Sequence, residues 1–567
     1  MSSFSFSNVS NVYMRRSKFP LDHGVKTTMS VGRLQPIDII EVYPGDSFRC
    51  KEGHVLQLSS AYLRPVLDNL FLDMYYFFVP SRLLYDDWEK VFGDPKPSSY
   101  RQSNFKEAPS STSVQTVSEL SIAQFLGLPL GKVPKGIDVL PFRAFAQIYN
   151  EWFRNENVVN EVHVQTGEFS NIEILNGNPW SETNYTGLCP KIPKKNDYFT
   201  SCLPSPQKGE VINFGLSVIP ETDLLVRTGK DVPYSSVNFD NSLRYQSSSP
   251  NGLGNTLPHY LCYQPLSAST SEQSGLGVAT SASFTPSGPL MYSTPTNLHA
   301  TFPEMAFQAS SVNDLRVAFA LQKMLEQDAR TGTRYREYIL GHFGVSNADA
   351  RMQIPEFLGG RRTPLNTYQV AQTSPPNTGK NSLASLGAFG RGDGGSRFTK
   401  SFTEHGYVFC IGALRQFHTY QQGIQKFWFR HKREDFYDPK FANLGEMPVY
   451  NAELFVPQTV TDEQSIQDLG VFGYNEAWAD LRYKPSIVTG QLATGATETL
   501  DIYHFADYYG QSPTLTADFV NETAQFFDRT IAVPSTSQDN FVADFYFKID
   551  AYRVMPVRSV PGLIDHH

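Results

Sequence analysis

Residues 72–79 read Leu-Asp-Met-Tyr-Tyr-Phe-Phe-Val and are almost all apolar. Such a run is typical of a β-strand that is covered on both faces. Residues 541–549, near the other end of the chain, alternate apolar and polar side chains, as a strand with one exposed face does. Early and late strands that pair across long insertions are typical of a jelly roll. We therefore predict a mainly β fold, an eight-stranded antiparallel jelly roll with long loop and helical insertions and with strands near 37–79, 404–414 and 541–549.

Two segments have helical spacing, and we predict helices at 142–154 and 314–328. The first has aromatic residues along one face: Phe142, Phe145, Tyr149, Trp152 and Phe153. The second follows Asn313, which can cap a helix, and has one side lined by Leu315, Phe319, Gln322 and Leu325. Both stripes predict core packing rather than a cofactor site. Helix-length spacers between successive strands are missing, which disfavours a doubly wound sheet.

Composition and turn residues divide the chain into five parts. These are an extended N-terminal arm (1–36), the first part of the jelly roll with a helical insert (37–207), a variable surface insertion (208–308), a helical and loop insertion (309–400), and the remaining strands, loops and C-terminal tail (401–567). The 208–308 insertion is rich in Ser, Thr, Gly and Pro, as surface loops are. A disordered linker is the alternative, against which stand the possible anchors Tyr260, Tyr263, Phe284 and Tyr292.

The overall composition indicates a globular protein with extensive interfaces. Hydrophobic residues make up 40% and charged residues 18% of the chain, and aromatic residues reach 13%. The net charge of −8 argues against wholesale binding of polyanions, so a nucleic-acid role must be regional. We expect no membrane insertion, because no apolar run reaches the length of a bilayer span. The five cysteines are scattered, which predicts reduced thiols and neither a zinc site nor a disulfide framework.

Motifs for catalysis, cofactors or metals are incomplete. The stretch 127–133 (Gly-Leu-Pro-Leu-Gly-Lys-Val) lacks the spacing and the hydroxyl residue of a phosphate-binding loop. His405, His418 and His431 are too far apart for one helical metal face. The Arg-Gly-Asp string at 391–393 lies among glycines that indicate a flexible loop. We therefore predict no enzyme, although a jelly-roll enzyme such as a cupin or glycosidase, with residues paired only in space, stays an alternative.

The strongest chemical signal is the basic aromatic segment, residues 427–433 (Phe-Trp-Phe-Arg-His-Lys-Arg). Aromatic rings beside cationic side chains bind single-stranded nucleic acid without base preference, because the bases stack on the rings and the cations neutralise the phosphates. The candidate nucleic-acid residues in it are Trp428, Arg430, Lys432 and Arg433, and the arm adds Arg15, Arg16 and Lys18. A solvated basic loop beside a buried aromatic patch explains the same pattern, and both interpretations stay open.

The C-terminal residues 559–567 combine a bend with apolar anchors. Pro561 and Gly562 can fix the bend, while Val560, Leu563 and Ile564 are apolar in a polar terminus. Burial of such side chains contributes about 1.5–3 kcal/mol each. We expect this tail to dock at a subunit interface. We likewise expect the aromatic residues of the 208–308 insertion to lie at subunit interfaces.

Blocks of sequence along almost the whole chain resemble the major capsid proteins of the Microviridae, especially the gokushovirus branch. They include 74–88 (Met-Tyr-Tyr-Phe-Phe-Val-Pro-Ser-Arg-Leu-Leu-Tyr-Asp-Asp-Trp), 140–145 (Leu-Pro-Phe-Arg-Ala-Phe), 355–360 (Pro-Glu-Phe-Leu-Gly-Gly) and 557–567 (Val-Arg-Ser-Val-Pro-Gly-Leu-Ile-Asp-His-His). The blocks keep the family's order, and only 208–308 has little that matches.

The resemblance implies a viral jelly roll that self-assembles into a T=1 icosahedral shell around circular single-stranded DNA. In the gokushovirus pattern the variable insertion forms mushroom-like protrusions at the three-fold axes, which implies contact with a receptor on the bacterial host surface. Further implied partners are minor capsid or DNA-pilot proteins, and no cofactor is implied. The implied location is the virion, assembled in the bacterial cytoplasm. A receptor-binding spike with its own jelly roll is the rival interpretation, and particle formation distinguishes the two.

Overall fold

The computed structural model describes residues 15–92, 106–168, 177–210, 212, 312–332, 334–373, 385–457, 459–460 and 463–558, together with the backbone of five short strands between 225 and 301. By their contacts the residues form two units. The larger unit is Met1–Gly209 with Lys323–His567, and the smaller unit is Glu210–Gln322.

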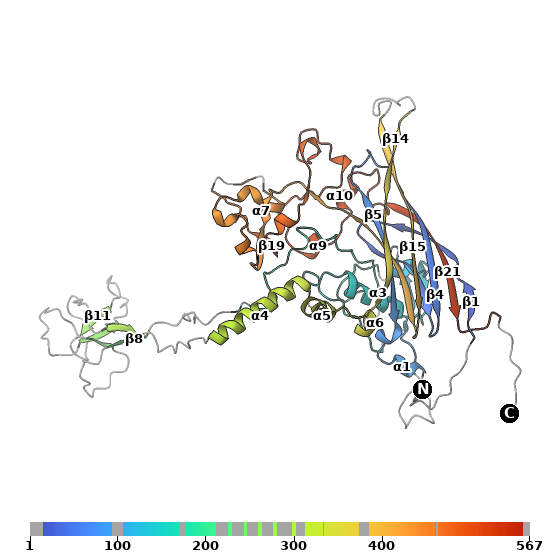
Figure 1. Ribbon diagram of the computed structural model, residues 1–567, viewed down its shortest axis with the longest axis horizontal. Coiled ribbons are helices and arrows are strands. Elements are labelled where there is room, and N and C mark those ends of the chain that lie inside the picture. Colours follow the sequence, from blue (N-terminus) through green and yellow to red (C-terminus); the bar gives the residue numbers. More distant parts are fainter. Residues whose placement is uncertain are drawn as a thin grey trace, which may run out of the picture. The chain divides into compact units, whose positions relative to one another are not determined.

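The larger unit is built on two antiparallel sheets (Figure 1). The six-stranded sheet has the order β1 (Ser17–Pro20), β21 (Phe541–Arg553), β4 (Ser47–Leu58), β15 (Leu386–Ser401) and β14 (Asn366–Ala371), and β2 (His23–Met29) also pairs with β21. The four-stranded sheet has the order β13 (Glu356–Pro364), β5 (Leu70–Pro80), β16 (Gly406–Gln416) and β3 (Leu34–Val42). The prediction of a mainly β fold with antiparallel sheets is confirmed, and the strands predicted near 37–79, 404–414 and 541–549 are present.

The main core lies between the two sheets. β4 and β21 alternate buried and exposed residues, and their buried side chains join those of β5 and β16 in one apolar cluster. Each side chain of this size contributes about 1.5–3 kcal/mol when fully buried. The members of the cluster include Phe48, Leu56, Phe545 and Ile549 from the six-stranded sheet and Leu72, Met74, Tyr76 and Val408 from the four-stranded sheet.

The four-stranded sheet is covered on its other face as well. Phe77 of β5 and Phe409 of β16 share a second core with α3 (Leu140–Ile148), which continues as a π-helical turn, η3 (Tyr149–Phe153). The aromatic face predicted for 142–154 lies in this core or packs against it. β5 is therefore buried from both sides, as its apolar run predicts.

Part of the expected N-terminal arm belongs to the six-stranded sheet. Lys18 of β1 lies opposite Tyr552 of β21, and Lys26 of β2 lies opposite Asp544 of the same strand. The first and last described strands of the chain are thus direct neighbours.

The range 309–400, for which only helices and loops were expected, also contains β13, β14 and β15. The glycines at 390–396 lie within β15, so the expectation of a flexible loop there is wrong. A Cβ on Gly394 would lie 2.5 Å from Oγ1 and 2.8 Å from Cγ2 of Thr363 in β13. Glycine here allows a close approach of the other sheet, and the same composition resembles a loop in the sequence.

The helices are short except for α4 (Val312–Thr331), which confirms the helix predicted at 314–328. Its expected core packing is wrong for Phe319, whose side chain is 67% exposed, because periodicity defines a helix face without defining what covers it. No helix in the described ranges is long and apolar enough to cross a membrane. The others are α1 (Trp88–Phe92), α2 (Ile122–Phe125), α5 (Tyr335–Phe343), α6 (Asp349–Met352), α7 (Asn451–Leu454), α8 (Ala479–Arg482), α9 (Ala517–Val520) and α10 (Gln525–Asp528).

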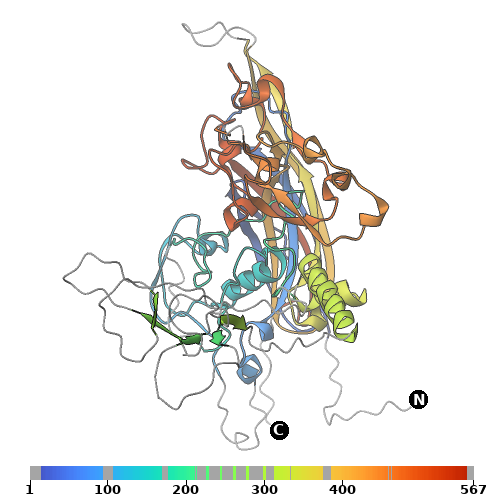
Figure 2. The same ribbon diagram turned by 90° about the vertical axis from the view of Figure 1, so that its left-hand side faces the viewer.

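A third apolar core lies in a lobe built mainly from residues 417–530, coloured orange to red in Figures 1 and 2. Phe199 and Tyr420 stack edge to face there, with ring centroids 4.8 Å apart. Small strand pairs support the lobe and the α3 region: β18 (Glu446–Tyr450) with β19 (Val471–Glu476), β17 (Thr419–Tyr420) with β20 (Ser486–Ile487), and β6 (Gln115–Val117) with β7 (Gly131–Val133).

The smaller unit contains two small antiparallel sheets. One has the order β11 (Leu276–Ala279), β10 (His259–Tyr263) and β9 (Leu243–Tyr245), and the other pairs β12 (Leu298–Thr301) with β8 (Leu225–Thr228). The variable insertion therefore has β structure of its own.

Candidate nucleic-acid interface and buried ionic network

The basic aromatic segment spans one 3-10 turn, η4 (Lys426–Phe429), and the start of another, η5 (Arg433–Asp435). Trp428 is 66% exposed, and its ring centroid lies 4.9 Å from that of Phe427. Lys432 and Arg433 are exposed as well. Rings and cations that face solvent together are what unspecific binding of a single strand requires.

Arg430 is placed differently from its neighbours. Its guanidinium forms an ion pair with Asp480, only 13% of its side chain is exposed, and it lies 6.0 Å from the centre of the Trp478 ring. The charge of Arg430 is therefore compensated within the subunit. Asp435 also accepts hydrogen bonds from the backbone N–H groups of His431 and Lys432, at 2.9 and 2.8 Å. The alternative of a solvated basic loop remains open for this segment.

The candidates of the arm lie elsewhere in the larger unit. Arg15 and Arg16 are exposed just before β1, and Nζ of Lys18 lies 2.7 Å from Oδ1 of Asp550 in β21. The basic aromatic segment instead borders a cavity of about 230 Å³ that Phe427 and Arg430 line together with residues of α7 and α8. In Figure 1, β1 lies at the right-hand end of the six-stranded sheet, whereas α7 lies in the orange lobe to the left of the sheets. The structure does not bring the two candidate groups together.

The candidate interface residues have no described side chains. Tyr260 and Tyr263 belong to β10, of which only the backbone is described. The others lie outside the described residues: Phe284, Tyr292, Val560, Leu563 and Ile564. Their roles stay predictions.

A serine, a histidine and a glutamate meet in the main core. Nδ1 of His54 lies 2.7 Å from Oε1 of Glu52, and the hydroxyl of Ser396 donates to Oε2 of Glu52 at 2.7 Å. The side chains of His54 and Glu52 are completely buried, and the serine contacts the carboxylate rather than the imidazole. Tyr76 of the four-stranded sheet lies 2.7 Å from the Ser396 hydroxyl. The cluster ties the two sheets together and lacks the access and geometry of a nucleophilic triad.

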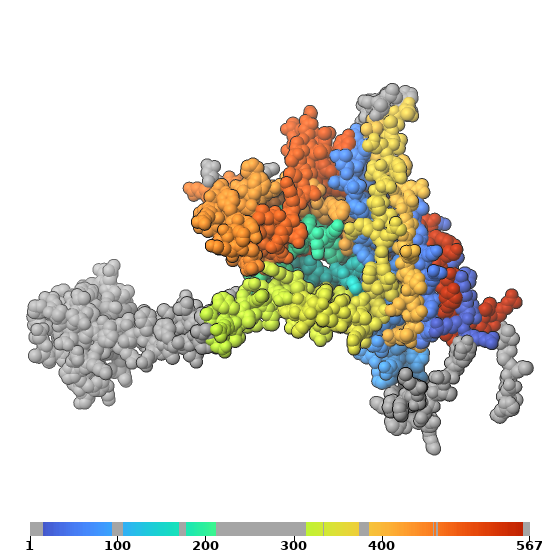
Figure 3. All heavy atoms as spheres, viewed as in Figure 1, coloured from blue at the N-terminus to red at the C-terminus, as the bar shows by residue number. Residues whose placement is uncertain are grey.

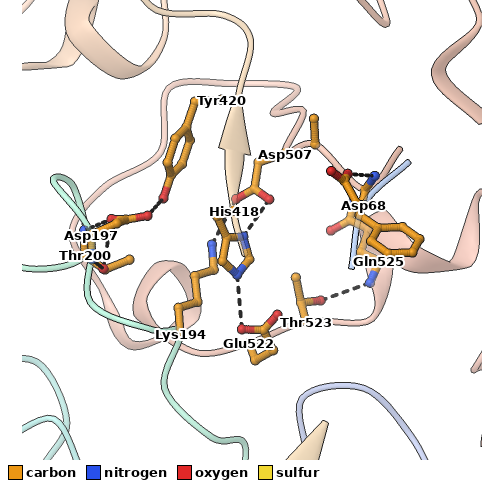
Figure 4. Close-up of polar contacts among 12 residues, drawn as sticks. Asp68, Lys194, Asp197, Thr200, His418, Tyr420, Asp507, Glu522, Thr523 and Gln525 are labelled. Carbon is orange, nitrogen blue, oxygen red and sulfur yellow. Dashed lines mark hydrogen bonds and ion pairs between the residues drawn. The ribbon is translucent and has the colours of Figure 1, made fainter. Parts of the chain in front are cut away.

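A second buried network lies in the lobe and joins it to the segment that contains Lys194 (Figure 4). His418, just after β16, has Nδ1 2.8 Å from Oδ1 of Asp507 and Nε2 3.1 Å from Oε2 of Glu522. Lys194 donates from Nζ to Oδ2 of Asp507 at 3.1 Å. All four side chains are at most 2% exposed. Within the described ranges no group of three or more His, Cys, Asp or Glu residues could hold a metal ion.

The charges in this network fix its protonation. Burial alone would lower the pKa of His418, but the carboxylates of Asp507 and Glu522 outweigh it and raise the pKa to about 9. Burial acts to raise the pKa of Asp507, and the charges of His418 and Lys194 outweigh that and lower it. The network therefore holds an imidazolium and a lysine between carboxylates. Its members are spread from 194 to 522, and no spacing in the sequence reveals them.

The comparison with known protein families decides the class of this chain. The profile of a family described as "Capsid protein (F protein)" matches residues 7–563. The chain belongs to this capsid protein family. Similar capsid proteins include VP1 of Chlamydia phage 1, which is 35% identical, and VP1 of Spiroplasma virus 4, which is 36% identical. VP1 of Bdellovibrio phage phiMH2K is 32% identical, and each comparison covers 98% of this chain and 97% of the relative.

The resemblance to gokushovirus-type major capsid proteins of the Microviridae is thereby confirmed. These relatives are structural proteins, and no catalytic activity is indicated for this capsid protein. Buried polar networks such as these two favour one defined arrangement of the segments that they join.

Proposed function

We propose that this capsid protein self-assembles into a T=1 icosahedral shell that encloses circular single-stranded DNA. The observation that carries the proposal is the match to phage capsid proteins along nearly the whole chain. The two facing sheets, with early and late strands side by side, support the further assignment of a viral jelly roll.

Exposed apolar side chains support assembly with further copies of the chain. Tyr335 and Phe343 of α5 are about 70% exposed. Tyr368 of β14 and Phe389 of β15 stack with ring centroids 5.2 Å apart on the surface. Exposed aromatic groups of this size mark interfaces, and closure of a symmetric shell multiplies modest contacts.

The variable insertion (208–308) is the part that we assign to surface protrusions at the three-fold axes and to host attachment. A long insertion adds only a slowly growing entropic cost of loop closure, so the sheets tolerate it. Tyr260, Tyr263, Phe284 and Tyr292 would then meet their counterparts in neighbouring subunits, and the tail anchors Val560, Leu563 and Ile564 would dock on the shell. The basic aromatic segment and the arm would contact the genome without base preference. Minor capsid or DNA-pilot proteins and a host receptor complete the proposed partners of a virion assembled in the bacterial cytoplasm.

Electron microscopy of the purified chain, with and without circular single-stranded DNA, tests the proposal. We expect closed isometric particles with a protein mass of about 3.8 MDa, which corresponds to 60 copies of the 63.7 kDa chain. Mass photometry of the same sample gives the copy number. A chain that stays monomeric or trimeric under all conditions, with and without DNA, would instead favour a receptor-binding spike.

A further inference from the structure

Three cationic side chains lie side by side on the exposed face of the six-stranded sheet. Lys548 of β21 is paired with Lys51 of β4, and Lys51 is paired with Arg397 of β15. We call these three residues the cation row. Neighbouring strands are about 4.8 Å apart, so three positive charges are rooted within about 10 Å. All three side chains are exposed.

The cation row has a cost for folding. Like charges directly opposite each other destabilise a sheet. None of the ion pairs found among the described residues includes Lys51, Arg397 or Lys548. Three adjacent cations without ion-pair partners of their own attract a ligand of opposite charge.

The next exposed row along the strands is almost free of side chains. Tyr546 of β21 lies between Gly24 of β2 and Gly53 of β4, and Gly53 is paired with Gly395 of β15. We call the three glycines the glycine strip. The Tyr546 ring is 55% exposed and lies two residues from Lys548, about 7 Å along the strand. A planar group can therefore approach the ring over bare backbone.

The charged residues around the cation row favour binding of an anion on this side of the glycine strip. Nζ of Lys18 lies 2.7 Å from Oδ1 of Asp550, which is paired in register with Arg49. Oδ1 of Asp22 accepts a hydrogen bond from the Ile549 N–H at 2.9 Å. Around the cation row, five cations therefore face two carboxylates. The cations are Lys18, Arg49, Lys51, Arg397 and Lys548, and the carboxylates are those of Asp22 and Asp550.

The side of the glycine strip away from the cation row is more acidic. Asp544 lies opposite Lys26 there, and Asp393 lies one strand beyond Val55 in the same row. The surface is thus polarised across Tyr546, with the positive charge on the side of Lys548. A ligand with an anionic backbone would therefore be attracted to the side of the Tyr546 ring on which Lys548 lies.

We propose that this face of the six-stranded sheet binds single-stranded DNA, with a base stacked on Tyr546 and phosphates along the cation row. The inference rests on the proposed enclosure of DNA and names a surface for it. Sheet surfaces with exposed rings, and grooves that combine rings with cations, are how single strands are held without reading sequence. A second protein copy fits less well, because burying three adjacent like charges carries a large desolvation cost. In Figure 1 no helix lies to the right of this sheet, and in Figure 3 atoms of its blue and red segments form the right-hand surface of the larger unit.

Fluorescence anisotropy with a labelled oligo-dT strand, measured over a range of salt concentrations, tests the cation row. Each phosphate contact with a single strand contributes about 0.7 to the slope of log K against log salt. We expect Lys51→Gln with Lys548→Gln to make the slope shallower by about 1.4. Lys132→Gln with Lys135→Gln removes two exposed cations of β7 and the turn after it and is the charge-matched control. This control should leave the slope unchanged.

The ring is tested separately from the charges. We expect Tyr546→Leu to weaken binding at least fivefold, the lower end of base stacking on an aromatic side chain, with the salt slope kept. Tyr546→Phe should restore the affinity. Photocrosslinking of 5-iodo-deoxyuridine DNA to the unmodified protein should label the peptide that contains Tyr546, which needs no variant to fold.

The outcomes separate this inference from the proposed function. Variants that form shells and bind DNA with unchanged affinity and slope would overturn the inference and leave shell assembly intact. Variants that bind DNA normally and fail to form shells would show that the face is a subunit interface, which also overturns it. Failure of the unmodified chain to form particles concerns the proposed function alone, because the oligonucleotide assay uses the subunit.

Discussion

Nδ1 of His418 and Oδ1 of Asp507 lie 2.8 Å apart in almost complete burial. Because Glu522 contacts the other ring nitrogen, the imidazole is held as a cation. Its pKa is raised from 6.5 to about 9, so folding favours the protonated form. The resulting stabilisation is fully present below pH 6.5 and is lost as the pH rises through about 9.

We predict that the free energy of unfolding of the subunit falls by about 3 kcal/mol between pH 6.5 and pH 9 through His418 alone. Urea denaturation at several pH values measures this decrease. His418→Gln should flatten the profile and leave the slope contributed by His23, whose pKa is also raised to about 9, chiefly by its hydrogen bond to Asp38. His163→Gln, at an exposed position, is the control. Equal slopes in all three proteins would contradict the assigned charge state.

Lys194 and Lys191 provide a matched pair of substitutions. The ion pair of Lys194 with Asp507 is buried, whereas that of Lys191 with Asp518 has side chains 54% and 93% exposed. We predict that Lys194→Met costs about 3–5 kcal/mol of stability, because it leaves a buried carboxylate without its partner. Lys191→Met should cost less than about 1 kcal/mol. Thermal and urea unfolding measure both, and similar losses would show that Asp507 is adequately compensated by His418.

The strands were predictable where burial decides the pattern. The apolar run of β5 and the alternation of β21 both follow from which faces the core covers. β15 was missed because its glycines serve close packing, and glycine in a sequence indicates a turn as readily. The exposure of Phe319 was missed because helical spacing does not identify the surface that the face contacts.

The candidate sites were predictable only where neighbours in sequence are neighbours in space. Trp428, Lys432 and Arg433 are such a group, and all three side chains are exposed. Arg430 was assigned to the same role because Asp480, which compensates its charge, is distant in the chain. The cation row joins residues 51, 397 and 548, and only strand register brings them together.

A substitution at Gly394 tests whether the two sheets need a glycine at their close approach. We predict that Gly394→Ala destabilises the subunit by about 1–3 kcal/mol, because the new methyl group would overlap Thr363. Gly495→Ala, at a glycine whose Cβ would meet nothing within 4 Å, should change stability by less than about 0.5 kcal/mol. Chemical denaturation of both variants gives the comparison. A neutral Gly394→Ala would mean that β13 is free to shift away from β15.

The basic aromatic segment makes separable predictions for its cations. Lys432→Ala with Arg433→Ala should make the salt slope of single-strand binding shallower by about 1.4 and leave the melting temperature unchanged. Arg430→Ala should instead lower stability by about 1–3 kcal/mol, because Asp480 loses its partner. Anisotropy titrations and thermal melts of the same samples distinguish the two effects. An unchanged slope for the double variant would favour the solvated loop.

Replacing residues 215–300 with a short Gly/Ser linker tests the role of the insertion. We predict particles that assemble in normal yield and lose attachment to the host, because the two principal sheets take no strand from this range. Electron microscopy and adsorption assays on host cells measure the two properties. Failed assembly with attachment retained would reverse the assignment.

The pairing of β4 with β21 also determines when the six-stranded sheet can be completed during synthesis of the chain. β4 ends at Leu58 and its partner begins at Phe541, so at about 5–20 residues per second the ribosome supplies the partner roughly 25–100 s later. Until then one edge of β4 is an open template, and pairing over such a separation is intrinsically slow. A chain that lacks residues 541–553 therefore cannot complete the six-stranded sheet. For the proposed shell, this makes complete translation a requirement for every subunit that can take part in assembly.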